Sequence, residues 1–366
     1  MLTRRQLVAA LATAPIAARV RAQTTNYPPY RGAIVVDALG GPGDPDQADP
    51  AAPLSARALA DAKASGITLC NQTVAVGGDS WDEALRGFAF WQRELDAHPD
   101  AFVKVTRGAH IAQAQGSGRM GLVFGVQGLS YIGEDLARLD TLHDLGLRIA
   151  QLTYNVRALT GDGCLEPGNA GISRFGRRLI EHAEERRMII DLSHGGRRTI
   201  AEAVAAAKMP FITHTGCAAL VDHPRNVPDE ILRAVAQKGG VVGIYFMPFL
   251  RPAGQQHLDD VVRHIEHAVN AAGEDHVGIG TDGVISTVVV DDKYRKAFAE
   301  QVQRRRKLGI SAPGEVEDVY TFVPELNDPR RLETLGAALA KRGFSDARVL
   351  KILGGNFARG FAEALG

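Results

Sequence analysis

Eight short apolar runs, each followed by a polar or glycine-rich corner and a helical stretch, dominate the pattern of this chain. Near-continuous apolar runs rich in β-branched residues, alternating with helical stretches, are typical of a parallel sheet covered by helices. The count of eight predicts a single-domain α/β fold, a (β/α)₈ TIM-type barrel, with a doubly wound sheet as the structural alternative. No GxGxxG motif follows any run, so a dinucleotide site is not supported. The predicted strands are residues 33–38, 67–74, 121–127, 149–154, 188–194, 210–214, 239–246 and 276–282.

The charge balance and the cysteine count exclude several classes of protein. The chain has 42 basic and 42 acidic residues, whereas a nucleic-acid-binding domain has a basic excess. We therefore expect no nucleic-acid partner and no electrostatic docking to anionic membranes. The three cysteines, Cys70, Cys164 and Cys217, are too few for a disulfide framework, and they lack the CxxC spacing of a cysteine-based zinc site.

The start of the chain predicts an export signal. Residues 4–5 are arginines, residues 7–18 form a short apolar run, and residues 20–22 (VRA) fit the small-x-small cleavage pattern. The Thr-Arg-Arg-Gln-Leu stretch is typical of a twin-arginine signal. We expect residues 1–22 to be removed and residues 23–366 to form the barrel of a periplasmic or secreted bacterial protein. No other segment is long or apolar enough to span a bilayer, so we expect no integral membrane segment after cleavage.

Polar residues at the carboxyl ends of barrel strands are the catalytic candidates in this fold. His194 and His214 end consecutive strands, and neighbouring strands lie about 4.8 Å apart, so their imidazoles can converge on one metal ion. Asp282 ends the eighth strand in a small-residue run and is placed to act as a base or a further ligand. The strand-end residues are Asp37, Gln127, Tyr154, His194, His214 and Asp282.

Six spaced segments resemble the membrane (renal) dipeptidase family of zinc-dependent barrel hydrolases. They follow the order seen in that family, from about Val35 to Phe361. The resemblance implies a binuclear zinc site and the hydrolysis of small peptides. The segments are IIDLSH, ITHT, HPRNVPDEIL, GGVVGIYF, VGIGTDG and ILGGNFAR.

The resemblance also implies roles for individual residues. His194 and His214 match the two histidines that help to hold one of the family's metal ions. Asp282 matches the catalytic aspartate, which handles the proton of the attacking water. Arg225 matches the arginine that grips the substrate carboxylate, and a planar guanidinium suits that bidentate contact.

Four other positions depart from the family's pattern. Leu39 and Gly41 stand where the family has a histidine and an aspartate that hold the other metal ion. Gln127 replaces the glutamate that bridges the two ions, and Tyr154 replaces the histidine that polarises the scissile carbonyl. The loss of two carboxylates removes about the charge that one divalent cation needs in a partly buried site.

These departures predict one divalent transition metal, with zinc implied by the resemblance. Its ligands would be His194 and His214, together with the amide oxygen of Gln127 or the carboxylate of Asp282. Two histidines, one carboxylate and an open position form an accepted catalytic zinc set, although Asp282 is less available as a base when it is a ligand. Tyr154 keeps a hydrogen-bond donor where the family has an imidazole, so oxyanion stabilisation can persist.

The first functional hypothesis is a metal-dependent hydrolase that cleaves a dipeptide or a related small amide carrying a free carboxylate. The alternatives are a lyase or isomerase acting on a small carboxylate substrate and a catalytically inactive protein that binds small molecules. The predicted partner is a small-molecule or dipeptide substrate, with a homodimer as a candidate assembly.

Two other features are interpreted as structural. His264 and His267, three residues apart in a helical stretch, are expected to form a surface pair. The basic stretch 293–307 is expected to be a solvated helix.

Overall fold

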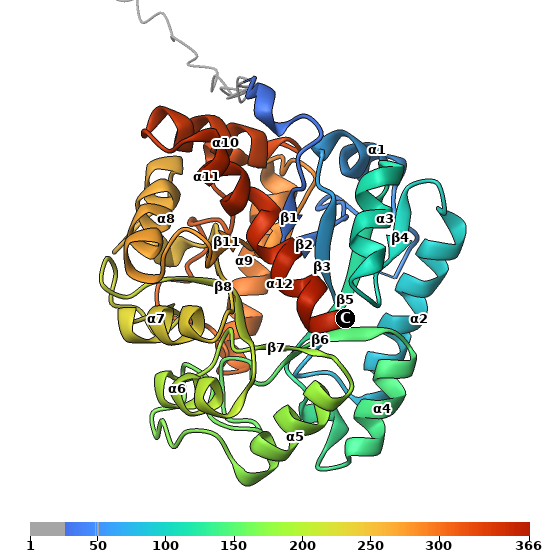
Figure 1. Cartoon of the computed structure of the whole chain (residues 1–366), viewed down its shortest axis with the longest axis vertical. Helices are drawn as coiled ribbons and strands as arrows, with labels where there is room; N and C mark the ends of the chain where they lie inside the picture. Colours follow the sequence, from blue (N-terminus) through green and yellow to red (C-terminus); the bar gives the residue numbers. More distant parts are fainter. Residues whose placement is uncertain (1–25, 48, 50) are drawn as a thin grey trace, which may run out of the picture.

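Eight parallel strands form a ring (Figure 1). The computed structural model describes residues 26–47, 49 and 51–366, and in it the order around the ring is β1-β3-β5-β6-β7-β8-β10-β11. All neighbouring pairs on this path are parallel. The backbone N–H of Ala38 donates to the carbonyl of Ile279 at 2.8 Å, so the first and last strands also meet. The ring strands are β1 (Val36–Asp37), β3 (Leu69–Val76), β5 (Met120–Gln127), β6 (Leu147–Gln151), β7 (Ile189–Asp191), β8 (Pro210–Cys217), β10 (Val242–Ile244) and β11 (Val277–Ile279).

The barrel predicted from the sequence is confirmed, and the doubly wound alternative is wrong. Each of the eight apolar runs supplies one ring strand, and the strands follow chain order. A doubly wound sheet reverses its order at a switch point and keeps two open edges. Four short strands lie outside the ring order. Strand β4 (Phe102–Lys104) pairs with β5, β9 (Asn226–Val227) pairs with β8, and β2 (Gly40–Gly41) pairs with β12 (Gly283–Val284).

Helices cover the outside of the ring (Figure 1). Local capping sets where several begin: the Ser55 side chain accepts from the N–H of Ala58 at α1, and Ser80 and Glu83 form a reciprocal capping box at α2. Helix α7 begins directly after Pro228, as the sequence predicts. The helices are α1 (Ala56–Ser65), α2 (Trp81–Ala97), α3 (Ala109–Ser117), α4 (Leu136–Asp144), α5 (Arg174–Glu185), α6 (Arg197–Ala206), α7 (Asp229–Gln237), α8 (Leu258–Ala272), α9 (Asp292–Lys307), α10 (Arg331–Lys341), α11 (Asp346–Leu350) and α12 (Asn356–Leu365).

One end of the ring is closed by an apolar cluster. The cluster takes residues from the beginnings of the strands, among them Leu69, Ile189 and Phe211, and adds Phe357 and Phe361 from α12. The rings of Phe211 and Phe361 meet edge to face with centroids 5.4 Å apart. Helix α12 runs across this end of the barrel (Figure 1). The carboxyl ends of the strands, at the opposite end, are therefore left to carry a site.

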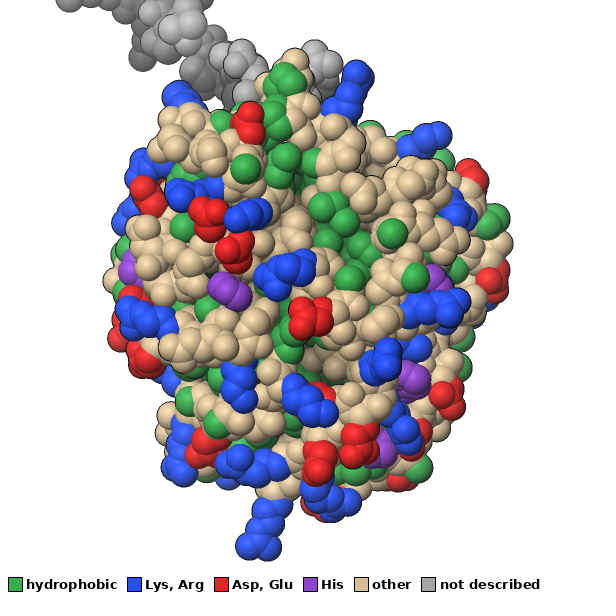
Figure 2. Space-filling model, in the orientation of Figure 1, with side chains coloured by type: hydrophobic (Ala, Val, Ile, Leu, Met, Phe, Trp, Pro, Cys, Tyr) green, Lys and Arg blue, Asp and Glu red, His purple; other side chains and the backbone are tan. Residues whose placement is uncertain are grey.

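The surface charge, the membrane-spanning potential of the helices and the predicted export signal are features outside the site. Figure 2 shows basic and acidic side chains interspersed over the face on which α12 lies. Within the described residues, no helix has the length and apolar character needed to cross a membrane. The predicted export signal, residues 1–22, lies outside the described residues.

Candidate active site

Three strand ends bring His194, His214 and Asp282 together. His194 follows β7, His214 lies in β8 and Asp282 follows β11. One possible ligand atom from each side chain lies within 4.8 Å of the other two. The two imidazole rings meet edge to face with centroids 4.9 Å apart. The chain thus brings together two imidazole nitrogens and one carboxylate oxygen, the kinds of atom that bind a metal ion such as zinc.

The backbone at two of these residues is strained. His194 has φ 64° and Asp282 has φ 58°, and they are two of the four described non-glycine residues with positive φ. Left-handed backbone conformation costs a non-glycine residue of order 1–3 kcal/mol, and it persists where the surrounding structure imposes it. Such strain clusters at functional sites, because it aims a side chain in a direction that relaxed backbone does not allow.

Asn155 determines which nitrogen of His194 carries the proton. The Asn155 amide nitrogen donates to the carbonyl of Ile310 at 2.7 Å, so the amide oxygen faces His194. Nδ1 of His194 lies 2.6 Å from that oxygen. An amide oxygen only accepts, so Nδ1 must carry the hydrogen, and Nε2 keeps its lone pair.

Thr213 and Asp191 do the same for His214. The Thr213 hydroxyl donates its only hydrogen to the Asp191 carboxylate at 2.6 Å. It must therefore accept from Nδ1 of His214, which lies 2.9 Å away. Asp191 is itself held by the hydroxyl and backbone N–H of Ser193, at 2.7 and 3.0 Å. Partners of this kind orient metal-binding histidines in proteins.

The Nε2 atoms of His194 and His214 are both buried and have no hydrogen-bond partner among the described residues. Burial, and then the positive charge of Arg225, lowers the pKa of both imidazoles well below the usual value. Both are therefore neutral at pH 7, with lone pairs facing the same region. A buried polar atom without a partner is rare in a folded protein. A metal ion would satisfy both atoms at once, so these residues fit the predicted metal.

Asp282 and Arg225 supply opposite charges to a cavity of about 180 Å³, which His194 also lines. Burial raises the pKa of Asp282 to about 6, and Arg225 acts against this rise. Only 4% of Arg225 is exposed, yet its Nη2 has no partner among the described residues. The guanidinium also lies over the Tyr245 ring, 5.6 Å from the centroid. The cavity therefore offers an unused cationic donor for an anionic group of a ligand.

Tyr154 lies at the same cavity and is held by residues that the sequence did not reveal. Its ring stacks on His194 with centroids 4.3 Å apart. Nη1 of Arg305 donates to the Tyr154 hydroxyl at 3.0 Å. Glu315 grips Arg305 bidentately, at 2.7 and 2.9 Å. Burial raises the pKa of Tyr154, against the opposing effect of Arg305, so the phenol keeps its proton.

The basic helix at 293–307 was expected to present a solvated face, and the structure shows that the last turn of this helix also lines the cavity. This stretch is α9, and Arg305 points into the cavity, where Phe298 and Val302 of the same helix also lie. The only available sequence signal was the helical spacing that places Arg305 on the same helix face as the apolar residues Phe298 and Val302. That spacing does not show which arginine of the QRRRK run faces inward.

The four positions that depart from the family's pattern contribute no carboxylate or imidazole. Leu39 is a buried leucine, and Gly41 lies beside Gln72, whose amide oxygen would overlap a Cβ built on Gly41. The amide nitrogen of Gln127 donates to the Thr73 hydroxyl at 3.1 Å. Gln127 as a metal ligand stays a prediction.

His264 was expected on the surface and is instead buried in the structure. Its Nδ1 accepts from the N–H of Cys217 at 2.9 Å, and its Nε2 lies 2.9 Å from the carbonyl of Leu250. Both ring nitrogens are thus used within the fold, which leaves no lone pair for a metal. His267 is partly exposed and lies 2.7 Å from a carboxylate oxygen of Asp229.

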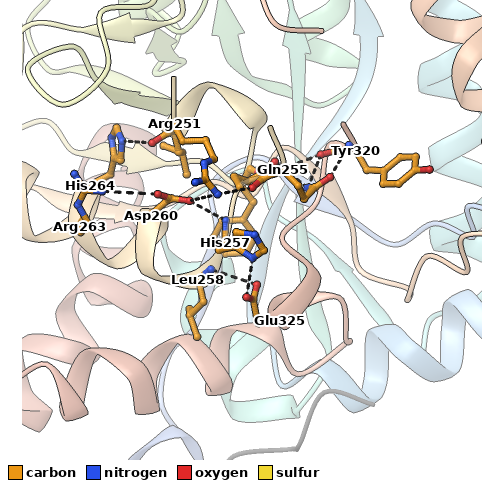
Figure 3. A network of polar contacts seen from close by, with 12 residues as sticks. Arg251, Gln255, His257, Leu258, Asp260, Arg263, His264, Tyr320 and Glu325 are labelled. Carbon is orange, nitrogen blue, oxygen red and sulfur yellow. Dashed lines mark hydrogen bonds and ion pairs between the residues drawn. The ribbon is translucent and has the colours of Figure 1, made fainter. Parts of the chain in front are cut away.

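Figure 3 shows a polar network at the start of α8, which holds the segment around Tyr320. The Gln255 amide nitrogen donates to the carbonyls of Tyr320 and Phe322 at 3.1 and 2.7 Å, and its oxygen accepts from the N–H of Tyr320 at 2.8 Å. The segment held in this way carries Thr321, which lines the cavity. The side chain of Gln255, 65 residues away in the sequence, therefore fixes the segment that carries Thr321.

Comparison with other proteins gives a consistent result. The profile of the membrane dipeptidase family (peptidase family M19) matches residues 57–305. The dipeptidase verJ of Clonostachys rogersoniana is 34% identical over 196 residues, which is 51% of this chain and 50% of that protein. The dipeptidase tcpJ of Claviceps purpurea is 27% identical over 277 residues, 74% of this chain and 57% of that protein. The chain spans about half the length of these curated relatives.

Solved structures share the whole fold. An amidohydrolase from Pseudomonas aeruginosa superposes with a TM-score of 0.78 at 26% identity, covering 92% of this chain and 98% of that one. A metallopeptidase from Rhodobacter sphaeroides, liganded with a phosphinate mimic of the dipeptide L-Ala-D-Ala, gives 0.71 at 19% identity, covering 90% and 99%. At that identity the second likeness shows the fold alone.

Proposed function

Because the chain belongs to the membrane dipeptidase family, we propose that it is a metal-dependent hydrolase working with one metal ion in place of two. Its substrate would be a dipeptide or a related small amide with a free carboxylate. One observation carries the proposal: the buried Nε2 atoms of His194 and His214 have no partner among the residues that the structure describes, and they lie beside the Asp282 carboxylate. Two histidines and one carboxylate with an open position suit catalytic zinc.

The residues present favour one metal ion. His194, His214 and Asp282 would hold it, and when bound it would supply Lewis-acid polarisation of the scissile carbonyl and acidify the attacking water. The position of the family's other ion has lost its ligands, because Leu39 and Gly41 have no donor atoms in their side chains. A second ion would also need negative charge that this part of the site no longer provides.

Arg225 and Asp282 would bind the substrate and move a proton. Nη2 of Arg225, which has no partner among the described residues, would donate to the substrate carboxylate and so place the amide over the strand ends. Asp282 has two carboxylate oxygens, so ligation through one leaves the other to accept a proton from water and pass it to the leaving amine. Its pKa of about 6 without a metal suits an acid–base group near neutral pH.

Tyr154 would stabilise the oxygen of the scissile carbonyl. A guanidinium has no acceptor, so the Tyr154 oxygen accepts from Arg305 and its own hydrogen remains free to donate. A donor already fixed in place costs no reorganisation as negative charge develops on the carbonyl oxygen. Arg305 acts through Tyr154 and is thus a positioning residue.

Metal content and hydrolysis together test the proposal. We expect about one transition-metal ion per chain by elemental analysis, and cleavage of Ala-Ala but not of Ala-Ala amide, which lacks the carboxylate. Two ions per chain would contradict the one-metal site. A metal-loaded protein that binds Ala-Ala without cleaving it would instead be the inactive binding protein considered from the sequence.

Export completes the proposal. Residues 4–5 and 20–22 support a twin-arginine signal and a periplasmic or secreted protein. A reporter fused to residues 1–30 should be exported, and replacement of both arginines by lysine should retain it inside the cell.

A further inference from the structure

A second cavity, of about 290 Å³, adjoins the candidate active site. Gln301 and Thr321 line both cavities, so the two share a wall. Thr281, which directly precedes Asp282 in the chain, also lines the second one. A ligand with its scissile bond at Asp282 can therefore extend from one cavity into the other.

Arg331, at the start of α10, gives this second cavity its only charge among the described lining residues. Only 6% of Arg331 is exposed. Its Nη2 donates to the carbonyls of Val284 and Ile285, and its Nε donates to the carbonyl of Asp328 at 3.3 Å. These contacts fix the guanidinium and leave Nη1 without a hydrogen-bond acceptor among the described residues.

The charge of Arg331 is not neutralised by an ion pair with any carboxylate in the described part of the chain. Burial lowers the pKa of Arg331, while Asp37, Asp328 and Asp61 are near enough to raise it without forming an ion pair with it. The Asp37 carboxylate accepts from the N–H and hydroxyl of Thr281, at 2.8 and 2.6 Å, and from the N–H of Leu39 at 3.3 Å. Buried charges in proteins are normally paired, so an unpaired buried guanidinium at a cavity wall indicates an anionic ligand.

Ser286 gives a second, independent indication. It is 1% exposed, lines the same cavity, and its hydroxyl has no partner among the described residues. A serine hydroxyl can donate one hydrogen bond and accept two, and leaving it buried without any is unfavourable. Ser286 directly follows Ile285, whose carbonyl holds Arg331, so both unused groups belong to one corner of the cavity.

The rest of the lining suits a short aliphatic stem. Phe246, Val284, Val323 and Leu326 are apolar, and no acidic side chain lines the cavity among the residues that the structure describes. A chain of a few methylene groups would pack against this wall. A carboxylate at its end would meet Nη1 of Arg331 and the hydroxyl of Ser286.

We propose that this cavity is a second anion subsite, so that the preferred substrate carries two acidic groups. One carboxylate would bind Arg225, and the other, on the acyl side of the scissile amide, would bind Arg331 and Ser286. This deepens the proposed function and rests on it for the position of the scissile bond. The chemical class is an amino acid acylated by a dicarboxylic acid, or a dipeptide with an acidic first residue.

The test compares two probes that differ only in the second charge, glutarate and its monoamide glutaramate. Binding to the purified protein is measured by isothermal titration calorimetry. Because hydrogen bonds to charged groups are the strong ones, we expect glutarate to bind about 10- to 100-fold more tightly. The ratio of the two affinities should fall to about 1 in Arg331→Met and should become smaller in Ser286→Ala. The preference should persist in Arg330→Met, a matched control that removes the same charge one residue from the cavity.

Three results would overturn the subsite: equal binding of the two probes by the wild type, no binding of either, or a preference that survives in Arg331→Met. If Arg331→Met does not fold, Ser286→Ala decides, since it removes only an unpartnered hydroxyl and should not lower the melting temperature.

Hydrolysis of Glu-Ala and Gln-Ala separates this proposal from the proposed function. If neither is cleaved while the glutarate preference remains, the hydrolase is refuted and the subsite stands. If both are cleaved with equal kcat/KM, the hydrolase stands and the subsite is refuted.

Discussion

Replacing Asn155 with alanine should weaken zinc binding, although Asn155 does not belong to the predicted metal-ligand set. Its amide oxygen lies 2.6 Å from Nδ1 of His194 and is what keeps the hydrogen on that nitrogen. Without it, the imidazole is free to place the hydrogen on Nε2, and that tautomer has no lone pair on the nitrogen that faces the site. Loss of a partner of this kind typically costs 10- to 100-fold in metal affinity, about 1.4–2.7 kcal/mol.

The measurement is competition for zinc against a chromophoric chelator at pH 7.5. Thr213→Val should show a similar loss, because it removes the acceptor for Nδ1 of His214. Thr215→Val is the matched control, since this buried hydroxyl donates to the carbonyls of Arg225 and Gly216 and not to a histidine. Asn155→Ala also removes one of the two donors to the Ile310 carbonyl, the other being Nη2 of Arg305 at 3.3 Å, so folding must be checked by circular dichroism first. Folded Asn155→Ala and Thr213→Val proteins with wild-type zinc affinity would refute the tautomer argument.

Other substitutions test the remaining parts of the site. His194→Ala and His214→Ala should each abolish metal binding, measured by elemental analysis, while circular dichroism shows an intact barrel; full occupancy in either would place the ion elsewhere. Asp282→Asn should stabilise the metal-free protein by up to about 3 kcal/mol at pH 8. The pKa of Asp282 is about 6 in the folded protein and 3.8 in the unfolded chain, so the charged carboxylate destabilises the fold at high pH. Urea titrations should show this gain in stability vanishing towards pH 4. Arg305→Met should lower kcat more than it raises KM. It should also raise the pKa of the Tyr154 phenol in an ultraviolet titration, with Tyr154→Phe as the reference that identifies the Tyr154 signal. An unchanged kcat and an unchanged phenol pKa would limit Arg305 to a structural role. The triple change Leu39→His, Gly41→Asp and Gln127→Glu should destabilise the protein, because Gln72 occupies the space beside Gly41. The metal content should rise towards two ions per chain only when Gln72→Ala is added. Two ions in the triple variant alone would show that Gln72 is no obstacle.

The barrel and the three converging side chains were predictable from the sequence. Strand and helix periods are local properties of the backbone, and a count of eight apolar runs in alternation with helices favours the (β/α)₈ barrel over the doubly wound sheet. Once the strands are parallel neighbours, their carboxyl ends share an edge. His194, His214 and Asp282 then had to lie at the same end of the barrel, whatever the loops do.

The tertiary structure alone decided which residues complete the site. Arg305 and Tyr154 are 151 positions apart, and their contact depends on how α9 lies against the cavity and on Glu315 of the following segment, which holds Arg305. Within the described part of the chain, the lack of an ion pair at Arg331 and the unused hydroxyl of Ser286 likewise follow from which groups remain without partners after packing. A sequence pattern reports the periodicity of a segment, whereas hydrogen-bond satisfaction is a property of the whole fold, and that is where the chemistry of this site resides.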